Sequence, residues 1–516
     1  MKRGLLLFCF IIKVISADAQ LQLNWLRTER DTSAAPGYNL LEDLVLDENS
    51  NLYVNGTIDS FQTIVPIYIS YDSSGMERWR RTVDGLGLNF SWRSLKSPLG
   101  HVIFAGEYED QTGTNNMIYT EYNYSGDSIG GGIMNSPGFT TGDDLSDICI
   151  DRSGNLFLGG QIRVGSDFPA AVARFDTGSE FKWLSSYPIL PGWSTGDVRA
   201  IEMCEDTGMY CLTVNFTGFA SMLYCDTSGT FDWGVTLPLS TDNFHSALTT
   251  DNDFNAIVGG RYNNAFGLVK LNPHGDTLWT RSYSYPGLSS ASAEVVNIKT
   301  DSLNNLYVLG TANGINRYTL ITKFDPAGSI LWMDTARGVS SMYGKNKEYM
   351  QIKNGTVFFT TTFGESHIYG YNETGQRIID QPLILPGLTD PEVNAIEFNN
   401  TSIYLTGNSS IGFNVRLGFV ARHDDISMGI KESTESGSLT IFPNPTSDIL
   451  NFKFKNLGFA PKNYKIYDLK GRLIQEGTIN KMDQIKVDKL EQGNYVIQFF
   501  DEKWSFSKQF KIFTGN

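Results

Sequence analysis

The chain has 516 residues, of which 41% are hydrophobic, and a formal net charge of −15. Its length and apolar content predict a folded protein of more than one domain and exclude a disordered chain. The acidic balance opposes binding to nucleic acid and to anionic membrane surfaces, so we expect neither as a partner.

The N-terminus has the pattern of a secretory signal peptide. Two cations precede the apolar run GLLLFCFII, and the small-residue triplet ADA ends at Ala19. Lys13 breaks the apolar run after about nine residues, whereas a membrane-spanning helix needs about twenty. Residues 1–19 are therefore predicted to be a signal peptide, and no transmembrane segment is expected.

From residue 20 onward, one strand–turn–strand phrase recurs at intervals of 46 to 53 residues. Each copy is a short apolar strand, a turn containing Asp, Asn or Gly, and a second apolar strand that usually ends at Gly, as in LVLDENSNLYVNG. The eight copies begin at residues 44, 95, 148, 201, 248, 298, 350 and 396. They show no helical period, so each copy predicts an antiparallel β-hairpin.

A second phrase joins a third strand to a fourth. It has Asp or Asn, then Gly, then Trp seven residues after the Asp, as in FDPAGSILW. It follows seven of the eight hairpins, and two of those copies replace the Trp. The eighth unit stops at residue 425 without a fourth strand, while LQLNWLRT (21–28) is a strand with no unit before it. We therefore expect the N-terminal strand to complete the eighth unit.

Four strands in each unit of about 50 residues predict an all-β, eight-bladed β-propeller over residues 20–425. Seven blades is the alternative if one degenerate copy is misread. Closure by the N-terminal strand would hide sheet edges that otherwise invite aggregation. The two phrases resemble the propeller repeats of exported bacterial proteins and, more distantly, the tryptophan-docking repeats of pyrroloquinoline-quinone enzymes.

Four cysteines remain after the predicted signal peptide. Cys211 and Cys225 lie at mirrored distances from the turn NFTGFA and are candidates for a disulfide across two antiparallel strands. The alternative to this disulfide is that Cys211 and Cys225 are both free thiols. For Cys149 and Cys204 we expect buried thiols that fill small core spaces.

In a propeller, the two repeated phrases share one face and the variable loops share the other. Variable loops on a repeated scaffold usually carry binding specificity. One candidate ligand contact, Trp193, lies in a Pro-Gly-apolar connection that recurs between blades. The alternative role of this Trp is packing between neighbouring blades. The candidate ligand contacts on the loop face are Arg163, Trp193, Arg261, Tyr262, Arg317 and Tyr318.

Acidic residues precede the predicted innermost strands and should gather at the mouth of the central channel. Such a ring of carboxylates could hold Ca²⁺, and a solvated rim is the alternative. No other cofactor is expected, because the five His have no metal-ligand spacing. The candidate metal ligands are Asp144, Asp147, Asp197 and Glu294.

Two functions remain open from these residues. No catalytic motif stands in a suitable context, which favours a non-enzymatic binding or adhesion module for a glycan or a protein. The alternative is an extracellular polysaccharide hydrolase or lyase that uses carboxylates at the channel mouth.

The C-terminal segment differs from the repeats in composition and pattern. Residues 426–438 are polar and read as a linker. Residues 437–516 carry twelve Lys and Arg against eight Asp and Glu. Within residues 439–516, about seven short strands predict a small Ig-like β-sandwich.

Phrases in this segment resemble the type A C-terminal sorting domain of the Bacteroidetes type IX (Por) secretion system. The residues that carry the resemblance are Pro443, Asn444, Pro445, Asp468, Gly471, Gly493, Tyr495 and Lys511. The resemblance implies passage through the periplasm to the outer surface or the extracellular space. The implied partners are the translocon, the peptidase that removes the sorting domain and, for attached cargo, surface lipopolysaccharide.

Overall fold

The fold is all-β throughout the described residues. The structure, a computed structural model, describes residues 21–29, 39–60, 63–83, 89–110, 112–134, 143–164, 167–187, 196–205, 207–215, 217–240, 247–285, 293–312, 318–338, 349–353, 355–362, 366–399, 401–412, 415–425, 438–442, 446–455, 462–468, 473–479, 484–500 and 505–512. Every regular element among them is a β-strand, and none of them forms a helix able to cross a membrane. Contacts divide the chain into two units, Met1–Asp425 and Ile426–Asn516.

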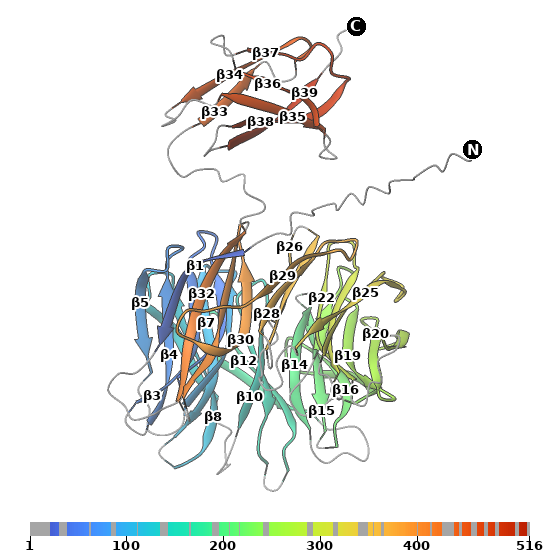
Figure 1. Ribbon diagram of the computed structural model, residues 1–516. Helices are drawn as coiled ribbons and strands as arrows, with labels where there is room; N and C mark the ends of the chain where they lie inside the picture. Colours follow the sequence, from blue (N-terminus) through green and yellow to red (C-terminus); the bar gives the residue numbers. More distant parts are fainter. Residues whose placement is uncertain are drawn as a thin grey trace, which may run out of the picture. The chain divides into compact units, whose positions relative to one another are not determined.

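The first unit is built from groups of four antiparallel strands that follow one another along the chain (Figure 1). The first four groups are β2 (Leu40–Leu46), β3 (Leu52–Ser60), β4 (Thr63–Tyr71) and β5 (Glu77–Thr82); β6 (Asn89–Ser97), β7 (His101–Glu109), β8 (Asn115–Asn123) and β9 (Ser128–Met134); β10 (Asp144–Ile150), β11 (Leu156–Gln161), β12 (Ala170–Phe175) and β13 (Phe181–Ser186); and β14 (Asp197–Cys204), β15 (Gly208–Val214), β16 (Phe219–Asp226) and β17 (Phe231–Ser240).

Three more groups follow the same order. They are β18 (Ala247–Thr250), β19 (Ala256–Tyr262), β20 (Ala265–Leu271) and β21 (Thr277–Tyr283); β22 (Ala293–Thr300), β23 (Leu306–Ala312), β24 (Tyr318–Phe324) and β25 (Ile330–Arg337); and β26 (Met350–Lys353), β27 (Thr356–Thr361), β28 (His367–Tyr371) and β29 (Arg377–Pro382). The long strand β17 reaches β19, where Ser240 pairs with Arg261, so two groups merge into one eight-stranded sheet. The repeat pattern does not predict this join.

The last group combines strands from both ends of the first unit. It contains β30 (Thr389–Phe398), β31 (Ser402–Gly412), β32 (Val415–Asp425) and the N-terminal strand β1 (Leu21–Glu29). Figure 1 shows β1, in blue, beside the orange β32. In the antiparallel register Trp25 lies opposite Arg422 and Thr28 lies opposite Phe419.

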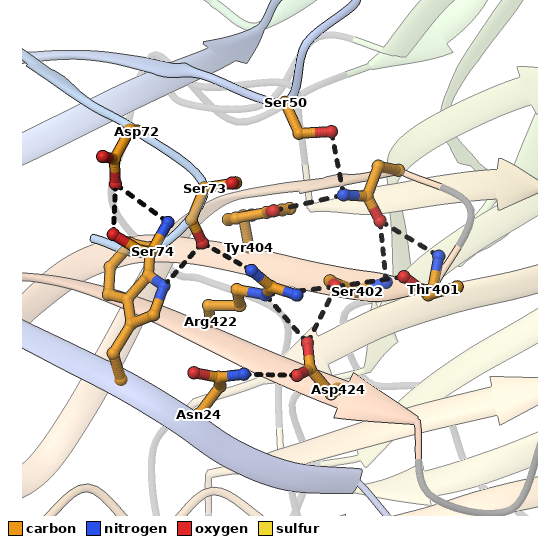
Figure 2. Close-up of polar contacts among 12 residues, drawn as sticks. Asn24, Ser50, Asp72, Ser73, Ser74, Thr401, Ser402, Tyr404, Arg422 and Asp424 are labelled. Carbon is orange, nitrogen blue, oxygen red and sulfur yellow. Dashed lines mark hydrogen bonds and ion pairs between the residues drawn. The ribbon is translucent and has the colours of Figure 1, made fainter. Parts of the chain in front are cut away.

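Polar side chains fasten this last group to a turn of the first sheet (Figure 2). The Asp424 carboxylate accepts hydrogen bonds from Asn24 and from Ser402, the latter at 2.8 Å. Arg422 donates to the same carboxylate at 2.8 Å and to the carbonyl of Ser73, between β4 and β5. Burial opposes ionisation of Asp424, but the three donors outweigh it and hold the pKa of Asp424 below its ordinary value.

The first strands of the successive groups contact one another in chain order, and β30 contacts β2 again. A buried hydrophobic cluster lies between each pair of neighbouring groups in the described part of the chain. Between the first and second sheets, for example, Tyr68 stacks on Phe104 at a centroid distance of 4.5 Å. Another cluster joins Trp25 and Val420 of the last group to Leu41 of the first. Four-stranded sheets packed in this way are consistent with a β-propeller.

Each turn of the recurring Asp–Gly phrase is stabilised by the side chain that opens it. In the turn after β4, the Asp72 carboxylate accepts the backbone N–H groups of Ser74 and Met76, both at 2.9 Å. Gly75 has a φ of 79°, and a Cβ there would lie 2.6 Å from the Trp25 ring. Glycine therefore allows both the turn conformation and the close approach of the indole.

The recurring Trp side chains dock on these turns. In six places among the described residues, an indole N–H donates to a backbone carbonyl in the equivalent turn of the next group. The pairs are Trp25 to Ser73 (3.1 Å), Trp79 to Tyr124 (3.2 Å), Trp183 to Thr227 (3.2 Å), Trp233 to Pro273 (3.1 Å), Trp279 to Pro326 (3.3 Å) and Trp332 to Glu373 (3.0 Å). The phrase therefore belongs to the scaffold, and it joins neighbouring groups.

The second unit consists of two sheets that share one core. One sheet contains β33 (Ser438–Phe442), β34 (Ile449–Lys455) and β37 (Gln484–Lys486), and the other contains β36 (Leu473–Thr478), β35 (Asn463–Asp468), β38 (Gly493–Phe500) and β39 (Ser505–Ile512). Side chains from both sheets meet in one buried cluster, in which the rings of Phe452 and Phe499 lie 4.7 Å apart.

Candidate functional site

The first strands of six groups share a β-bulge near their N-terminal ends. In the first group, Leu41 lies opposite Gly56 and Asp43 lies opposite Asn55, so the register skips Glu42. Bulges re-aim side chains and occur often beside active sites. The skipped residues, which we call the bulge residues, are Glu42, Trp92, Ser146, Arg199, Val296 and Asn394.

In five of the six groups, the glycine that ends the second strand of the hairpin phrase lies opposite the residue before the bulge. On β14 the equivalent partner is Thr213. Gly56 lies opposite the residue before the bulge, and a Cβ on it would be 2.1 Å from the carbonyl oxygen of Leu40. The same clash, at 1.8 to 2.0 Å, would arise at Gly106, Gly160 and Gly407. A recurring Gly at a strand end is therefore the signal in the sequence that marks these residues.

The residues after the bulges link one group to the next. The Asp43 carboxylate accepts the backbone N–H of Ser94 on β6 at 2.9 Å. At the equivalent position on β10, Asp147 accepts the backbone N–H of Ile201 on β14 at 2.8 Å. Its other oxygen is 3.2 Å from Nε of Arg93, and both side chains are buried. These carboxylates are thus engaged in contacts that hold neighbouring groups together.

Glu42 differs from these paired carboxylates. Its Oε2 lies 3.3 Å from Nδ2 of Asn394, which also donates to the carbonyl of Leu41 at 2.8 Å. Burial raises the pKa of Glu42 to about 7, and the negative charges of Asp43 and Glu392 add to the rise. The positive charge of Arg416 opposes this rise in the pKa of Glu42. Arg416 also lies 3.4 Å from the Glu392 carboxylate, with which it forms an ion pair. Near neutral pH the Glu42 carboxyl group can therefore give or take a proton.

The polar contacts continue onto the fourth group. The Ser146 hydroxyl lies 3.2 Å from one oxygen of Asp197, and Nη1 of Arg199 lies 3.3 Å from the other. Ser146 and Arg199 are bulge residues on neighbouring first strands. A series of polar contacts thus extends over β30, β2, β6, β10 and β14.

The ligand contacts predicted from the sequence come from several groups. Arg163 follows β11, Arg261 and Tyr262 lie on β19, and Tyr318 begins β24, so they belong to three different groups. The guanidinium of Arg163 lies over the Phe168 ring, 5.4 Å from its centroid, and Arg261 is 3.3 Å from Glu294. Two further predicted contacts, Trp193 and Arg317, lie outside the described residues.

The four predicted metal ligands lie on three first strands: Asp144 and Asp147 on β10, Asp197 on β14 and Glu294 on β22. Asp147 faces Arg93, Asp197 faces Arg199, and Glu294 faces Arg261. Asp144 lies at the start of β10, opposite Gln161. Within the described ranges, no three His, Cys, Asp or Glu side chains are grouped as metal ligands.

The predicted disulfide requires a correction. Cys211 and Cys225 are buried free thiols whose sulfur atoms lie 4.0 Å apart. The register places Cys211 opposite Leu223 and Cys225 opposite Met209, so the two cysteines are diagonal neighbours rather than a directly opposed pair. Cys149 and Cys204 are also buried free thiols, as expected.

In the second unit, part of the predicted sorting signal is described. Gly493 and Tyr495 lie on β38, where the Tyr495 hydroxyl donates to the carbonyl of Glu491 at 2.9 Å. Asp468 ends β35 and Lys511 lies on β39. Pro443, Asn444, Pro445 and Gly471 lie outside the described residues.

Solved structures similar to this chain have low sequence identity to it. A quinohemoprotein alcohol dehydrogenase from Pseudomonas putida HK5 is 10% identical with a TM-score of 0.48, over 78% of this chain and 76% of that one. The extracellular domain of a putative hybrid two-component system from B. thetaiotaomicron is 12% identical with a TM-score of 0.28, over 92% and 72%. The polysaccharide lyase Uly1 is 10% identical with a TM-score of 0.38, over 74% and 89%. A search among curated proteins finds no match.

The family comparison concerns the second unit. Residues 440–512 match the family model described as a secretion system C-terminal sorting domain (Por). This match agrees with the resemblance seen in the sequence. The chain therefore carries a C-terminal sorting domain of the type IX (Por) secretion system, which directs it to the cell surface or the extracellular space.

Proposed function

We propose that the first unit is an eight-bladed β-propeller closed by β1, and that it is a non-enzymatic binding or adhesion module for a glycan or protein ligand. Closure is supported by the pairing of β1 with β32 and by the cluster that contains both Trp25 and Leu41. Trp25 also donates to a turn of the first sheet in the same way as the other docked Trp side chains.

One observation favours binding over catalysis. The carboxylates that follow the bulges are engaged across sheets: Asp43 accepts a backbone N–H, and Asp147 accepts a backbone N–H and faces Arg93. A carboxylate engaged by such donors is already committed to contacts within the scaffold. These two carboxylates therefore serve the scaffold, and the bulge residues are the candidates to contact a ligand.

The alternative is an extracellular polysaccharide hydrolase or lyase, and Glu42 is the observation that favours it. A carboxyl group whose pKa is about 7 suits a general acid at neutral pH. Glycoside hydrolysis also needs a second carboxylate, and Glu392 is near enough to raise the pKa of Glu42. In this alternative, Glu42 donates a proton to the leaving oxygen and Glu392 acts as base or nucleophile.

The test is a screen of the full chain against immobilised polysaccharides and cell-surface proteins, combined with an assay for new reducing ends. We expect retention on a ligand without release of products. New reducing ends that disappear in Glu42→Gln would instead establish the enzymatic alternative. Absence of both retention and products would contradict both functions.

Export gives the chain further partners. The sorting domain implies interaction with the type IX secretion machinery. We also infer that residues 1–19 are removed as a signal peptide and that a sorting-domain peptidase cleaves the tail. The exported first unit is then released or attached to surface lipopolysaccharide.

A further inference from the structure

Five bulge residues come from five groups that neighbour one another: Asn394, Glu42, Trp92, Ser146 and Arg199. Contacts between adjacent strands link them. Asn394 lies 3.3 Å from Glu42. The charge of Arg93, the residue after Trp92, influences the pKa of Glu42. Ser146 and Arg199 both contact Asp197. Glu42, Ser146 and Asn394 are buried, and Trp92 and Arg199 are half-buried. The sixth bulge residue, Val296, differs in being an apolar member of a hydrophobic cluster.

These five positions are structurally equivalent but chemically diverse. The opposing Gly and the residue after the bulge hold the scaffold together, as at Gly56 and Asp43. The bulge position itself carries an amide, a carboxyl, an indole, a hydroxyl or a guanidinium group. Diversity at an equivalent position of a repeated scaffold is the pattern expected of a binding site.

Trp92 provides a large aromatic surface among these polar groups. Its ring stacks on Phe90 with centroids 5.1 Å apart and planes inclined by 10°, and both side chains are half-buried. Trp92 does not belong to the set of Trp side chains that dock on turns, because it lies on a first strand. A stacked and partly exposed pair of rings offers a flat apolar surface to a ligand.

The two arginines at or beside these bulges are each balanced by a carboxylate. Arg93 faces Asp147, and Arg199 faces Asp197. Burial keeps Glu42 largely protonated below pH 7, so it adds little charge there. An uncharged ligand with many hydroxyl groups fits this balance better than an ion does. Asn, Ser and a protonated carboxyl each donate and accept hydrogen bonds, as vicinal hydroxyl groups require.

We propose that the five bulge residues form a binding site for a neutral saccharide, in which the Trp92 and Phe90 rings stack on the apolar face of a sugar. This inference rests on the proposed binding function and narrows its ligand from glycan or protein to neutral glycan. The site is built from residues of the first strands and not from the loop residues predicted from the sequence.

The first test uses the full chain and calorimetric titration with neutral hexasaccharides of glucose, mannose, galactose or xylose. For the saccharide that binds, Trp92→Ala should weaken affinity about tenfold, the loss expected for one stacking contact. Trp92→Phe, which keeps a ring, should lose much less. Phe231→Ala, which removes an exposed ring from the outermost strand β17, is the matched control and should bind normally.

A second measurement needs no variant and so does not depend on folding of Trp92→Ala. N-bromosuccinimide oxidises accessible indoles, and peptide mass spectrometry locates the oxidised Trp. The bound hexasaccharide should protect Trp92 and leave the oxidation of Trp279 unchanged.

Other results of these binding experiments would contradict the proposed saccharide site. Saccharide binding that neither depends on Trp92 nor protects it would overturn this inference and leave the binding function standing. Retention of a protein ligand without binding of any saccharide would do the same. Binding only of acidic saccharides would contradict the argument from charge balance. Binding of neither saccharide nor protein would overturn both proposals.

Discussion

At the scale of single residues, two buried titratable groups of the first unit have pKa values shifted in opposite ways. Burial raises the pKa of Glu42 from 4.5 to about 7, and burial lowers the pKa of His423 from 6.5 to about 4. Glu42 is protonated more readily in the folded state than in the unfolded state, so its contribution to stability is lost as pH rises from 4.5 to 7. His423 is protonated less readily, so its contribution is lost as pH falls from 6.5 to 4.

These opposed effects predict a flat dependence of stability on pH between 4.5 and 6.5 in the wild-type chain. Each group contributes about 3 kcal/mol across its window, so the two nearly cancel. Other carboxyls with shifted pKa values, such as Asp72 and Asp251, have lowered values and titrate below this range.

Single substitutions should reveal the two opposing dependences of folding stability on pH. Glu42→Gln should make stability increase from pH 4 to 6.5, and His423→Gln should make it decrease from pH 4.5 to 7. Urea unfolding followed by Trp fluorescence measures this, because eight of the nine Trp precede residue 426. Parallel pH profiles for wild type and both variants would show that neither shift exists.

At the scale of the strand pair, the bulge on β10 packs closely against the glycine opposite it. A Cβ on Gly160 would lie 2.0 Å from the carbonyl oxygen of Asp144, so Gly160→Ala must either straighten the bulge or separate β10 from β11. We expect a loss of about 1–3 kcal/mol, the usual cost of overpacking. Gly178→Ala is the control, since its nearest neighbour is 3.4 Å away. Urea midpoints of the two variants should differ clearly, and equal midpoints would contradict the role given to Gly160.

The repeat made the strands and the docked Trp side chains predictable, but it did not predict the bulges or the cysteine register. Strand order and the unusual position of Trp25 follow from counting phrases along the chain. A bulge adds one residue without altering the apolar pattern around it, so Glu42 could not be recognised as a site residue. Val214 pairs with Ala220 across the turn, so Cys211 and Cys225 are two positions out of register. The nearly equal spacing of the two cysteines from the turn could not reveal this pairing. The ligand contacts expected on variable loops, such as Arg163 and Arg261, stay a prediction.

At the scale of the whole molecule, the sorting domain and the first unit have separate roles. Each unit has its own core, and contacts divide the chain after Asp425. Deletion of residues 437–516 should therefore leave the first unit folded but retained in the periplasm. Immunoblots of periplasm and medium test this, with a full-length chain as control. Recovery of the truncated chain from the medium would contradict the role of the sorting domain.

Closure of the first unit gives the last prediction. If β1 completes the final group as proposed, Trp25 is equivalent to Trp79, since each is buried and donates its indole N–H to a turn of the next group. Trp25→Ala and Trp79→Ala should then each cost about 3–5 kcal/mol, the usual loss for a large core side chain. An N-terminal strand that merely lay on the surface would make Trp25→Ala almost neutral. Deletion of residues 21–29 should additionally expose the edge of β32 and promote self-association, measurable by analytical ultracentrifugation.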